Sequence, residues 1–596
     1  MKIPFLSSLI RYFKIFYADV GSRLFILCAI IFVAGLSEGI GISLLLPLLN
    51  LENANAANNS YVSMIYQFFK KTSFGLSIQS ILALMLFAFS IKGLLIFIQG
   101  AYTAGITTGL VQEKRLEFCR KYSGMKYSFY LDSTIGNLNN LVTTEIDRAV
   151  AGFSKYSDVL IMLFNILVYS TAAFLMNWKL TLLVVLVCSV LFYFLRALSQ
   201  WIKNFSLNVS GLNAQIQSLL IQMIYNFKYL KATAGFPPLL KMLQDKIKLH
   251  RWYDYKTTTF SYISVALAEP LAVIFMSSLV IYHVIYLGRP MSEIFVLLIF
   301  FYKAFSKIFG LQIAWQKFSS TLGGVETVNT MAQQIQQEQE QYGKMRPERF
   351  KDAIKLQNVD ARLGNKTVLK GVSIEILKNK MVGIVGHSGA GKTTIFDLLV
   401  GLIRPSSGRI LFDDISYEDL DLAELRKFVG YVTQESTIFN DTIANNISFW
   451  QEMNEDGDEV NNRLVVAARQ AHCLNFIEKT ENGFETMIGD RGIKLSVGER
   501  QRLAIARELF KNPQIMIFDE ATSALDSDSE NLIQESIVEI KGSLTVVIIA
   551  HRLSTVKNCD MIYVISQGTV IEEGRFEELY NKPTSEFRKM CQLQHL

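Results

Sequence analysis

The sequence contains a glycine-rich loop of the kind that holds phosphate groups. The letters GHSGAGKTT at 386–394 follow an apolar run and precede a helical run, which gives G-x-x-x-x-G-K-[ST] between a strand and a helix. Glycines let backbone N–H groups close around phosphates, and the N-terminus of the following helix adds favourable partial charge. We expect Lys392 to reach the β- and γ-phosphates of a nucleotide and the Thr393 hydroxyl to bind Mg²⁺. The residues expected at the phosphates are Gly386, His387, Ser388, Gly389, Ala390, Gly391, Lys392, Thr393 and Thr394.

A second apolar run ends in two acids. The letters IMIFDE at 515–520 place Asp519 and Glu520 at the end of a buried strand. Asp519 has the chemistry of a Mg²⁺ ligand, and Glu520 is placed to polarise an attacking water. An acidic strand end alone is more often an edge or a cap. Together with the phosphate loop it predicts a nucleotide hydrolase.

Further motifs resemble those of ATP-binding cassette (ABC) proteins. The letters LSVGERQ at 495–501 resemble the family's signature loop, usually LSGGQ, and an Arg-rich helical run follows them. Gln434 in YVTQE resembles the Q-loop, SALD at 523–526 the D-loop, His551 in IIAHRLS the switch histidine, and GDRG at 489–492 the loop that exporters place before the signature. These motifs stand in the family's order and cover about 354–585.

The resemblance implies an α/β P-loop domain that binds ATP and Mg²⁺. It adds Gln434 and His551 to Glu520 as catalytic residues, and it adds Gln434 to Thr393 and Asp519 as Mg²⁺ ligands. It places Ser496, Val497, Gly498, Glu499 and Asp526 against nucleotide bound by a second copy of the domain. One chain has one phosphate loop and one signature, so two complete sites need two chains. A homodimer is expected, and a paralogous partner would satisfy the same geometry.

The sequence departs from the family's pattern at two places. Where the family stacks an aromatic on adenine, this chain has Leu363, so base selectivity is expected to be relaxed. Val497 and Glu499 replace the more usual Gly and Gln of the signature. Backbone donors survive both changes, so activity is expected to survive.

The residues before about 320 must position these motifs at a membrane. Half of the 596 residues are hydrophobic, only 19% are charged, and the formal net charge is +6, which excludes a disordered chain and a nucleic-acid partner bound through bulk charge. Six stretches have the length and polarity of membrane spans. They are 23–49, 78–112, 157–178, 179–203, 257–288 and 291–318.

The predicted architecture is an all-α transmembrane domain (1–330), a linker (331–350) and the ABC nucleotide-binding domain (351–596). Basic residues before the first span and after the second predict that both termini of this integral membrane protein are cytoplasmic. The expected location is a bacterial inner membrane. The polar connections 113–157 and 202–256 are expected to be helices that leave the membrane and turn back. This layout resembles exporters of type IV.

Charges inside the spans suggest the cargo. Lys92, Arg196 and Lys303 fall about 18–25 Å from the outer ends of their spans, in or near the inner leaflet. Lys307 shares a helix face with Lys303, so the lysines could line a basic chamber for a phosphate-bearing headgroup. Alternatively, these side chains snorkel to the interface or pair with Glu38 and Glu269.

The expected function is ATP-driven export by alternating access. The letters GLSEGIGISLLLPLL, which contain Glu38, are similar to the E-x-I-G-I-S…P stretch of lipid-linked oligosaccharide flippases. The expected cargo is therefore a lipid-linked saccharide or another anionic, amphipathic lipid taken from the membrane. A peptide or multidrug exporter is the alternative. An ATP-gated channel or regulator is disfavoured, because Lys392, Asp519, Glu520 and His551 are all present.

Overall fold

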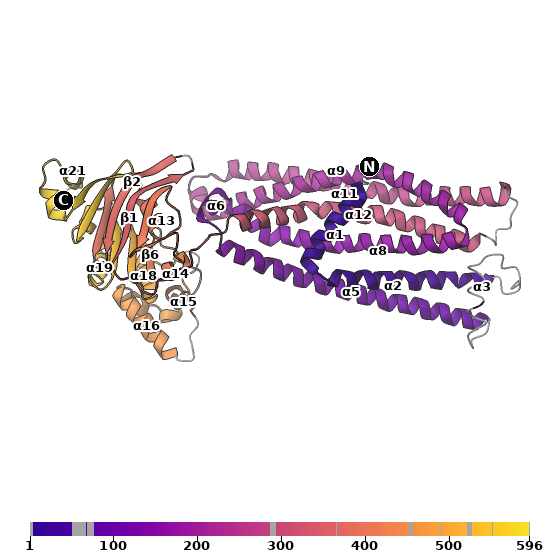
Figure 1. The fold of residues 1–596 in the computed structure, drawn as a ribbon, viewed down its shortest axis with the longest axis horizontal. Helices are drawn as coiled ribbons and strands as arrows, with labels where there is room; N and C mark the ends of the chain where they lie inside the picture. The colour runs from indigo at the N-terminus through magenta and orange to yellow at the C-terminus, as the bar shows by residue number, and fades with distance from the viewer. Residues whose placement is uncertain are drawn as a thin grey trace. The chain divides into compact units, whose positions relative to one another are not determined.

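The structure is a computed structural model that describes residues 4–49, 67, 77–286, 294–364, 366–451, 457–489, 492–520, 527–550 and 552–594. A few side chains inside these ranges, including those of 187–199, are not described. The chain divides into two compact units, Met1–Gln339 and Glu340–Leu596, shown in Figure 1.

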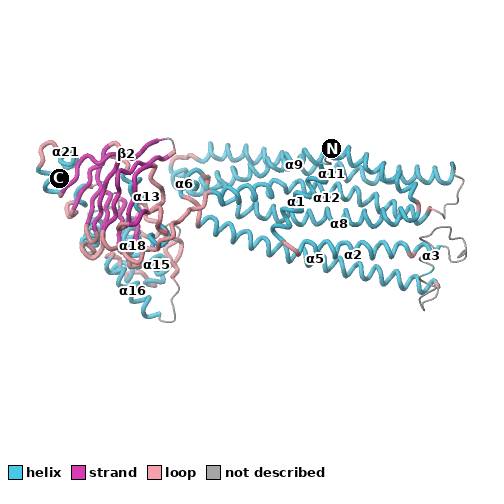
Figure 2. The backbone as a smooth tube through the Cα atoms, in the orientation of Figure 1, coloured by secondary structure: helices cyan, strands magenta, loops and turns pink. Residues whose placement is uncertain are grey.

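Within its described residues the first unit is built of helices, drawn in cyan in Figure 2. They are α1 (Pro4–Val20), α2 (Arg23–Ser43), α3 (Leu45–Leu49), α5 (Ile78–Ser123), α6 (Tyr127–Asp132), α7 (Ile135–Asn140), η1 (Leu141–Glu145), α8 (Ile146–Met176), α9 (Trp178–Tyr225), α10 (Phe227–Ala232), α11 (Phe236–Ile281), η2 (Tyr282–Tyr286) and α12 (Phe295–Gln337).

Four of these helices are about twice as long as a bilayer requires. Helices α5, α9, α11 and α12 have 46, 48, 46 and 43 residues. At 1.5 Å per residue they extend about 65–72 Å, roughly twice the hydrocarbon thickness of a membrane. Their polar ends form most of the connections 113–157 and 202–256, and the short helices α6, α7 and α10 lie at the turns. Between α8 and α9 the turn is minimal, because the side chain of Asn177 accepts a hydrogen bond from the Leu180 N–H at 3.1 Å and starts α9 at once.

Five stretches of the described helices are long and apolar enough to cross a membrane, and each overlaps an expected span: Arg23–Leu48, Ile78–Ser123, Ile135–Met176, Glu269–Tyr286 and Phe295–Gln337. The expected span 179–203 lies in α9, where the side chains of 187–199 are outside the description. The segment 331–350, expected to be a linker, is helical as far as Gln337, because the polar run MAQQIQQ continues α12 without a helix breaker.

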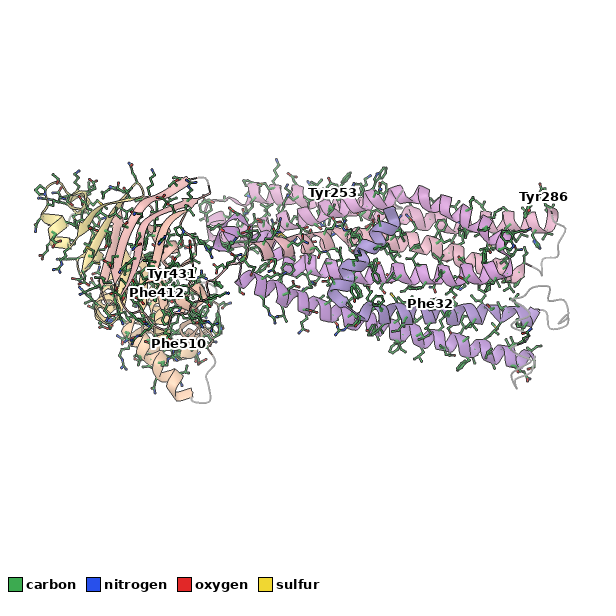
Figure 3. All side chains as sticks on the ribbon, viewed as in Figure 1. Phe32, Tyr253, Tyr286, Phe412, Tyr431 and Phe510 are labelled. Atoms are coloured by element: carbon green, nitrogen blue, oxygen red, sulfur yellow. The ribbon has the colours of Figure 1, made fainter. Side chains whose placement is uncertain are left out.

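The long helices pack side by side through small residues. Helix α8 lies along α12, α9 lies along α11 and α12, and α2 lies against α5. A Cβ atom added at Gly39 of α2 would meet the Val168 side chain at 2.8 Å, and one added at Gly324 of α12 would meet the Arg148 side chain at 2.7 Å. Such close approach of backbones is typical of membrane helix contacts. Phe32, labelled in Figure 3, makes an edge contact with Phe164 across α2 and α8.

The second unit contains two sheets. The four-stranded sheet has the order β2-β1-β4-β5 and is antiparallel, and the six-stranded sheet has the order β10-β9-β3-β8-β7-β6 with parallel pairing from β9 to β6. The strands are β1 (Ala353–Leu363), β2 (Lys366–Leu377), β3 (Met381–Gly386), β4 (Ser407–Phe412), β5 (Ile415–Ser416), β6 (Val429–Val432), β7 (Ile515–Asp519), β8 (Thr545–Ile549), β9 (Met561–Ser566) and β10 (Thr569–Gly574).

Helices cover these sheets and complete two apolar cores. Strands β3, β7 and β8 are buried along their whole length, which explains why they read as continuous apolar runs in the sequence. Phe412 and Tyr431, labelled in Figure 3, belong to β4 and β6. The helices are α13 (Lys392–Leu399), α14 (Leu422–Lys427), α15 (Ile443–Ser448), α16 (Gly457–Gln470), α17 (Leu474–Glu478), η4 (Gly483–Glu485), α18 (Val497–Phe510), α19 (Ser527–Glu539), η6 (Leu553–Val556), α20 (Phe576–Asn581) and α21 (Glu586–Leu593).

Candidate functional site

The glycine-rich loop connects the end of β3 to the start of α13, as the sequence predicts. Two of its glycines are required by their surroundings. A Cβ atom at Gly386 would lie 2.2 Å from the Ile565 carbonyl oxygen, and one at Gly391, where φ is +104°, would lie 2.6 Å from the Leu369 side chain. The loop therefore packs closely on the sheet. Of the loop residues, Ala390, Gly391, Lys392 and Thr394 are buried with Gly386, whereas His387, Ser388, Gly389 and Thr393 are exposed.

Lys392 folds back over this loop. Its Nζ donates hydrogen bonds to the carbonyl oxygens of Gly386, at 2.7 Å, and His387, at 3.1 Å. Burial lowers the pKa of the Lys392 ammonium group, and the carboxylates of Glu520 and Asp519 oppose this effect. The ammonium group thus lies at the loop and interacts with both acids at the end of β7.

Sheet topology brings the two acids to the loop. Strand β7 pairs in parallel with β8, and β8 pairs in parallel with β3, so their carboxyl ends share one edge of the sheet. Asp519 lies opposite Ile549, which in turn lies opposite Ile384 of β3. Ligands bind at this edge in open parallel sheets. Two segments separated by more than 120 residues therefore form one site.

Asp519 lies in an electrostatically unfavourable setting for an isolated carboxylate. Burial raises its pKa to about 6, with further contributions from Glu520 and Asp397, while Lys392 acts in the opposite direction. Asp397 of α13 is itself a half-buried acid whose pKa is raised by desolvation. Sequence reasoning did not single out Asp397, although an acid within the apolar run IFDLL was a signal that could have found it. A cation between these carboxylates would relieve their repulsion.

Glu520 is held in an unusual backbone conformation beside Gln434. Its φ is +46°, a left-handed value that strains a residue with a side chain by about 1–3 kcal/mol. The Glu520 N–H donates to the Ile549 carbonyl oxygen at 3.1 Å, and the Gln434 Nε2 donates to the Glu520 Oε2 at 2.8 Å. The structure therefore brings together Lys392, Asp519, Glu520 and Gln434, which the sequence places far apart.

The signature loop forms a capped helix N-terminus. Ser496 is the N-cap of α18: its Oγ accepts from the Glu499 N–H at 3.2 Å, and the Ser496 N–H donates to the Glu499 Oε2 at 2.8 Å. This reciprocal pair is a capping box, which the S-x-x-E spacing could have predicted. A Cβ atom at Gly498 would lie 2.3 Å from the Ser529 Oγ, so α19 packs directly on this glycine. Val497 is 46% exposed and leaves the N-terminus of α18 accessible.

Of three further residues expected at the nucleotide, the structure describes only Leu363. Leu363, at the end of β1, is 42% exposed and provides no aromatic ring for adenine. Asp526 and His551 lie outside the described residues, as does the middle of the motif at 489–492.

A second group of expected residues forms an ionic cluster in the helical unit. Glu38 of α2 has a side chain only 6% exposed, and its carboxylate pairs with Lys92 Nζ of α5 at 3.0 Å and Lys303 Nζ of α12 at 3.2 Å. The buried hydroxyl of Tyr169, on α8, lies near the same carboxylate. The lysine side chains are 24% and 40% exposed. Pairing with Glu38, one of the alternatives left open by the sequence, is therefore observed for both lysines.

The remaining intramembrane charges behave differently. Lys307 lies one turn beyond Lys303, is half-buried, and has no acid within ion-pair distance among the described residues. Glu269 is exposed, and the side chain of Arg196 is outside the description. By helical rise, Lys303 lies about 12 Å from the start of α12 and Lys92 about 21 Å from the start of α5.

Fold and site together define a class. A bundle with membrane-spanning helices is joined in one chain to a P-loop nucleotide-binding unit, which is the arrangement of a nucleotide-driven membrane transporter. The sequence matches two family descriptions, "ABC transporter" over residues 369–523 and "ABC transporter transmembrane region" over residues 24–309.

Relatives extend this match over nearly the whole chain. The chain is 31% identical over 579 residues to the heterocyst differentiation ATP-binding protein HepA of Nostoc sp., which covers 95% of this chain and 92% of the relative. It is also 31% identical over 563 residues to the ATP-dependent lipid A-core flippase of Aliivibrio fischeri, with 92% and 91% covered. The structure of a bacterial Atm1-family ABC exporter with ATP bound has the same fold, with a TM-score of 0.79, 21% identity, and 97% and 99% covered.

The chain belongs to the ABC transporter family. It is an exporter of the half-transporter type, an integral, multi-pass membrane protein whose nucleotide-binding domain binds ATP and couples ATP hydrolysis to transport. This agrees with the fold and activity expected from the sequence.

Proposed function

We propose that two copies of this chain form an exporter that moves an anionic, amphipathic lipid from the cytoplasmic side across the membrane, with a lipid-linked saccharide as the best candidate. The observation that carries this proposal is the ionic cluster of Glu38, Lys92 and Lys303, with Lys307 one turn away. The A. fischeri relative is named a lipid A-core flippase, which supports a lipid cargo.

The charges of this cluster do not balance. One carboxylate pairs with two lysines, and Lys307 lies one helical turn from Lys303, so one negative charge stands against three positive charges among the membrane helices. Uncompensated charge at this depth is costly unless it faces water or an opposite charge. Lys92 and Lys303 are partly exposed, so part of each side chain is open to the surroundings of the bundle, which supports contact with a cargo. A phosphate or pyrophosphate headgroup would neutralise the excess through charge-assisted hydrogen bonds.

The apolar surface of the bundle suits the rest of such a cargo. Along α5, Leu86 and Phe97 are each 72% exposed, and Ile96 is 50% exposed. In a bilayer these side chains would contact lipid chains or a second copy of the protein. A cargo with an anionic head and long apolar chains can therefore match both the charged cluster and the surface beside it.

In the nucleotide-binding domain each motif residue would have a separate role in ATP binding or hydrolysis. Lys392 would neutralise the phosphates, and the glycine-rich loop would donate backbone N–H groups to them. The hydroxyl of Thr393, the amide oxygen of Gln434 and the carboxylate of Asp519 are oxygen donors of the type that Mg²⁺ prefers. When bound, Mg²⁺ would offset phosphate charge. Glu520, oriented by the Gln434 amide, would polarise the attacking water, and His551 would contact the γ-phosphate.

The signature loop supports the proposed dimer. The N-terminus of α18, with Ser496, Val497, Gly498 and Glu499, is an exposed anion site that would face nucleotide on the partner domain, and Asp526 would lie at the same interface. ATP would draw the domains together and turn the membrane halves outward, and hydrolysis at Glu520 would reset them. We place the protein in a bacterial inner membrane. The basic residues before α2 and in the C-terminal part of α5 support a cytoplasmic position for both termini.

The test is ATPase stimulation by candidate cargo. The purified protein in nanodiscs would be titrated with polyprenyl-pyrophosphate saccharides, neutral lipids, peptides and amphipathic drugs. We expect stimulation by the pyrophosphate lipids, and an increase of tenfold or more in the concentration needed by Lys303→Gln and Lys307→Gln. Lys179→Gln, which removes an exposed lysine at the start of α9, is the matched control and should behave as wild type. Stimulation by peptides or drugs alone, or equal behaviour of all three variants, would contradict the proposed cargo.

A further inference from the structure

Helix α1 lies across the long helices of its unit, as Figure 1 shows, and is fixed there by aromatic side chains. Tyr12 and Phe16 are each 2% exposed and pack against Phe318 with ring centroids 5.1 and 6.2 Å apart. The Tyr12 hydroxyl donates to the Glu326 Oε1 at 3.0 Å, and the Tyr156 hydroxyl donates to the Leu9 carbonyl oxygen at 3.0 Å. One face of α1 is therefore part of the bundle.

A cavity of about 740 Å³ opens between α1 and the polar end of α12. From α12 it is lined by Glu326, Asn329, Thr330 and Gln333, whose spacing puts them on one helix face. From α1 its charged lining includes Arg11 and Lys14, three residues apart on another face. This groove is the α1–α12 groove.

The uncompensated charge of the α1–α12 groove is positive. Of its two acids, Asp19 is neutralised by an ion pair with Lys114 at 2.7 Å, whereas Glu326 accepts a hydrogen bond from the neutral Tyr12 hydroxyl and keeps its negative charge. Arg11 and Lys14 together outnumber this one carboxylate, so the net charge of the groove is positive. Arg11 and Lys14 are exposed, and within the described part of the chain neither has an acid within ion-pair distance. Both cations are therefore available to an anion from outside.

An apolar stripe runs along α1 beside these cations. Leu6, Ile10 and Tyr17 are 51%, 49% and 45% exposed, and their spacing of four and seven residues puts them on one face. A helix with exposed apolar residues next to basic residues is typical of the membrane interface. The surface therefore offers contacts for a molecule that has both an anionic head and apolar chains.

We propose that the α1–α12 groove binds the headgroup of an anionic phospholipid of the surrounding membrane. Arg11 and Lys14 contact the phosphate, the polar face of α12 contacts the remaining headgroup, and the acyl chains lie along Leu6, Ile10 and Tyr17. This site is separate from the cluster around Lys303. Between Lys303 and Glu326 the helix α12 rises about 35 Å. The bound lipid fixes α1, and hence α12, at the interface.

Photolabelling tests this proposal. The full-length protein in nanodiscs would be labelled with a photoactivatable phosphatidylglycerol, and labelled peptides from α1 and the end of α12 would be quantified by mass spectrometry. In the double variant Arg11→Gln/Lys14→Gln we expect apparent affinity to fall about ten- to thirtyfold, which corresponds to about 1 kcal/mol per cation. Lys241→Gln/Lys248→Gln removes two exposed lysines of α11 and is the control, with labelling unchanged.

Two further variants separate the explanations. Thr330→Trp should fill the groove and reduce labelling while both cations remain, which excludes a purely non-specific charge effect. Lys303→Gln should leave labelling at α1 unchanged, because the proposed cargo cluster is a different site. Equal labelling by a phosphatidylcholine probe, or unchanged labelling in the double variant, would overturn the proposal. Displacement of the probe by inorganic phosphate would assign the groove to another ligand and would overturn the proposal. Displacement by a lipid-linked saccharide but not by phosphatidylglycerol would overturn it for the same reason.

Discussion

Replacing Glu38 by Gln removes the single acid of the ionic cluster without changing the size of the side chain. The carboxylate is 6% exposed and holds Lys92 at 3.0 Å and Lys303 at 3.2 Å. In Glu38→Gln both ammonium groups face a neutral amide inside the helix bundle. Because breaking a buried pair from one side leaves uncompensated charge, the free energy of unfolding is expected to fall by about 3–5 kcal/mol. The partial exposure of the two lysines favours the lower figure.

Unfolding in detergent, followed by tryptophan fluorescence across an SDS titration, measures this change. The matched control is Glu269→Gln, which removes an exposed carboxylate from α11 and should change stability by less than about 0.5 kcal/mol. The double variant Glu38→Gln/Lys92→Gln gives the sharper result. Lys92→Gln should destabilise the wild type, because it removes an ion pair. It should stabilise Glu38→Gln, because it removes an unpaired charge.

Glu38→Gln should decrease stability but increase the apparent affinity for an anionic cargo. Without Glu38 the excess positive charge increases, so the concentration of anionic lipid that stimulates ATPase activity should decrease while stability decreases. A loss of less than about 1 kcal/mol in the free energy of unfolding of Glu38→Gln would contradict these expectations. A destabilising effect of Lys92→Gln in both backgrounds would contradict them as well. Either result would mean that the cluster is hydrated and has no uncompensated charge for a cargo to neutralise.

Three further predictions concern the nucleotide-binding domain. Gly498→Ala should destabilise the domain by about 1–3 kcal/mol and reduce ATPase activity, because the new methyl group would overlap Ser529. Adding Ser529→Gly should restore both stability and activity, which are measured by thermal unfolding and phosphate release. Glu499→Ala should lower the free energy of unfolding by about 1 kcal/mol, because the capping box is lost. Glu499→Gln should lose less, because its side-chain oxygen can still accept a hydrogen bond from the Ser496 N–H. Equal losses in the two variants would exclude the capping role. Leu363→Tyr should lower the KM for ATP relative to GTP about fivefold by supplying a stacking ring, and an unchanged ratio would show that adenine binds elsewhere.

The nucleotide site was largely predictable because its chemistry is local. The loop that ends in Lys392 and the strand that ends in Asp519 each carry their signal within a few residues, and burial of β3 and β7 on both faces produces the apolar runs that precede them. The order of strands in the sheet was not predictable from these segments. Pairing across β8, which brings Asp519 to the phosphate loop, depends on contacts between distant parts of the chain.

In the helical unit, contacts between distant residues could not be predicted from the sequence. Hydropathy located the apolar stretches, but it could not decide whether Lys92 and Lys303 were free or paired, because Glu38 is 265 positions from Lys303. The α1–α12 groove had no sequence signal, because its two walls come from opposite ends of the unit and meet through Tyr12 and Glu326.

Transport itself is the most direct test of the account. The protein would be reconstituted into sealed vesicles with a fluorescent polyprenyl-pyrophosphate saccharide, and access of a membrane-impermeant quencher would be followed after addition of Mg²⁺ and ATP to the side that bears the nucleotide-binding domains. We expect ATP-dependent movement of the lipid to the opposite leaflet, lost in Glu520→Gln and weakened in Lys303→Gln. ATP hydrolysis that proceeds normally while the lipid distribution stays unchanged would contradict it.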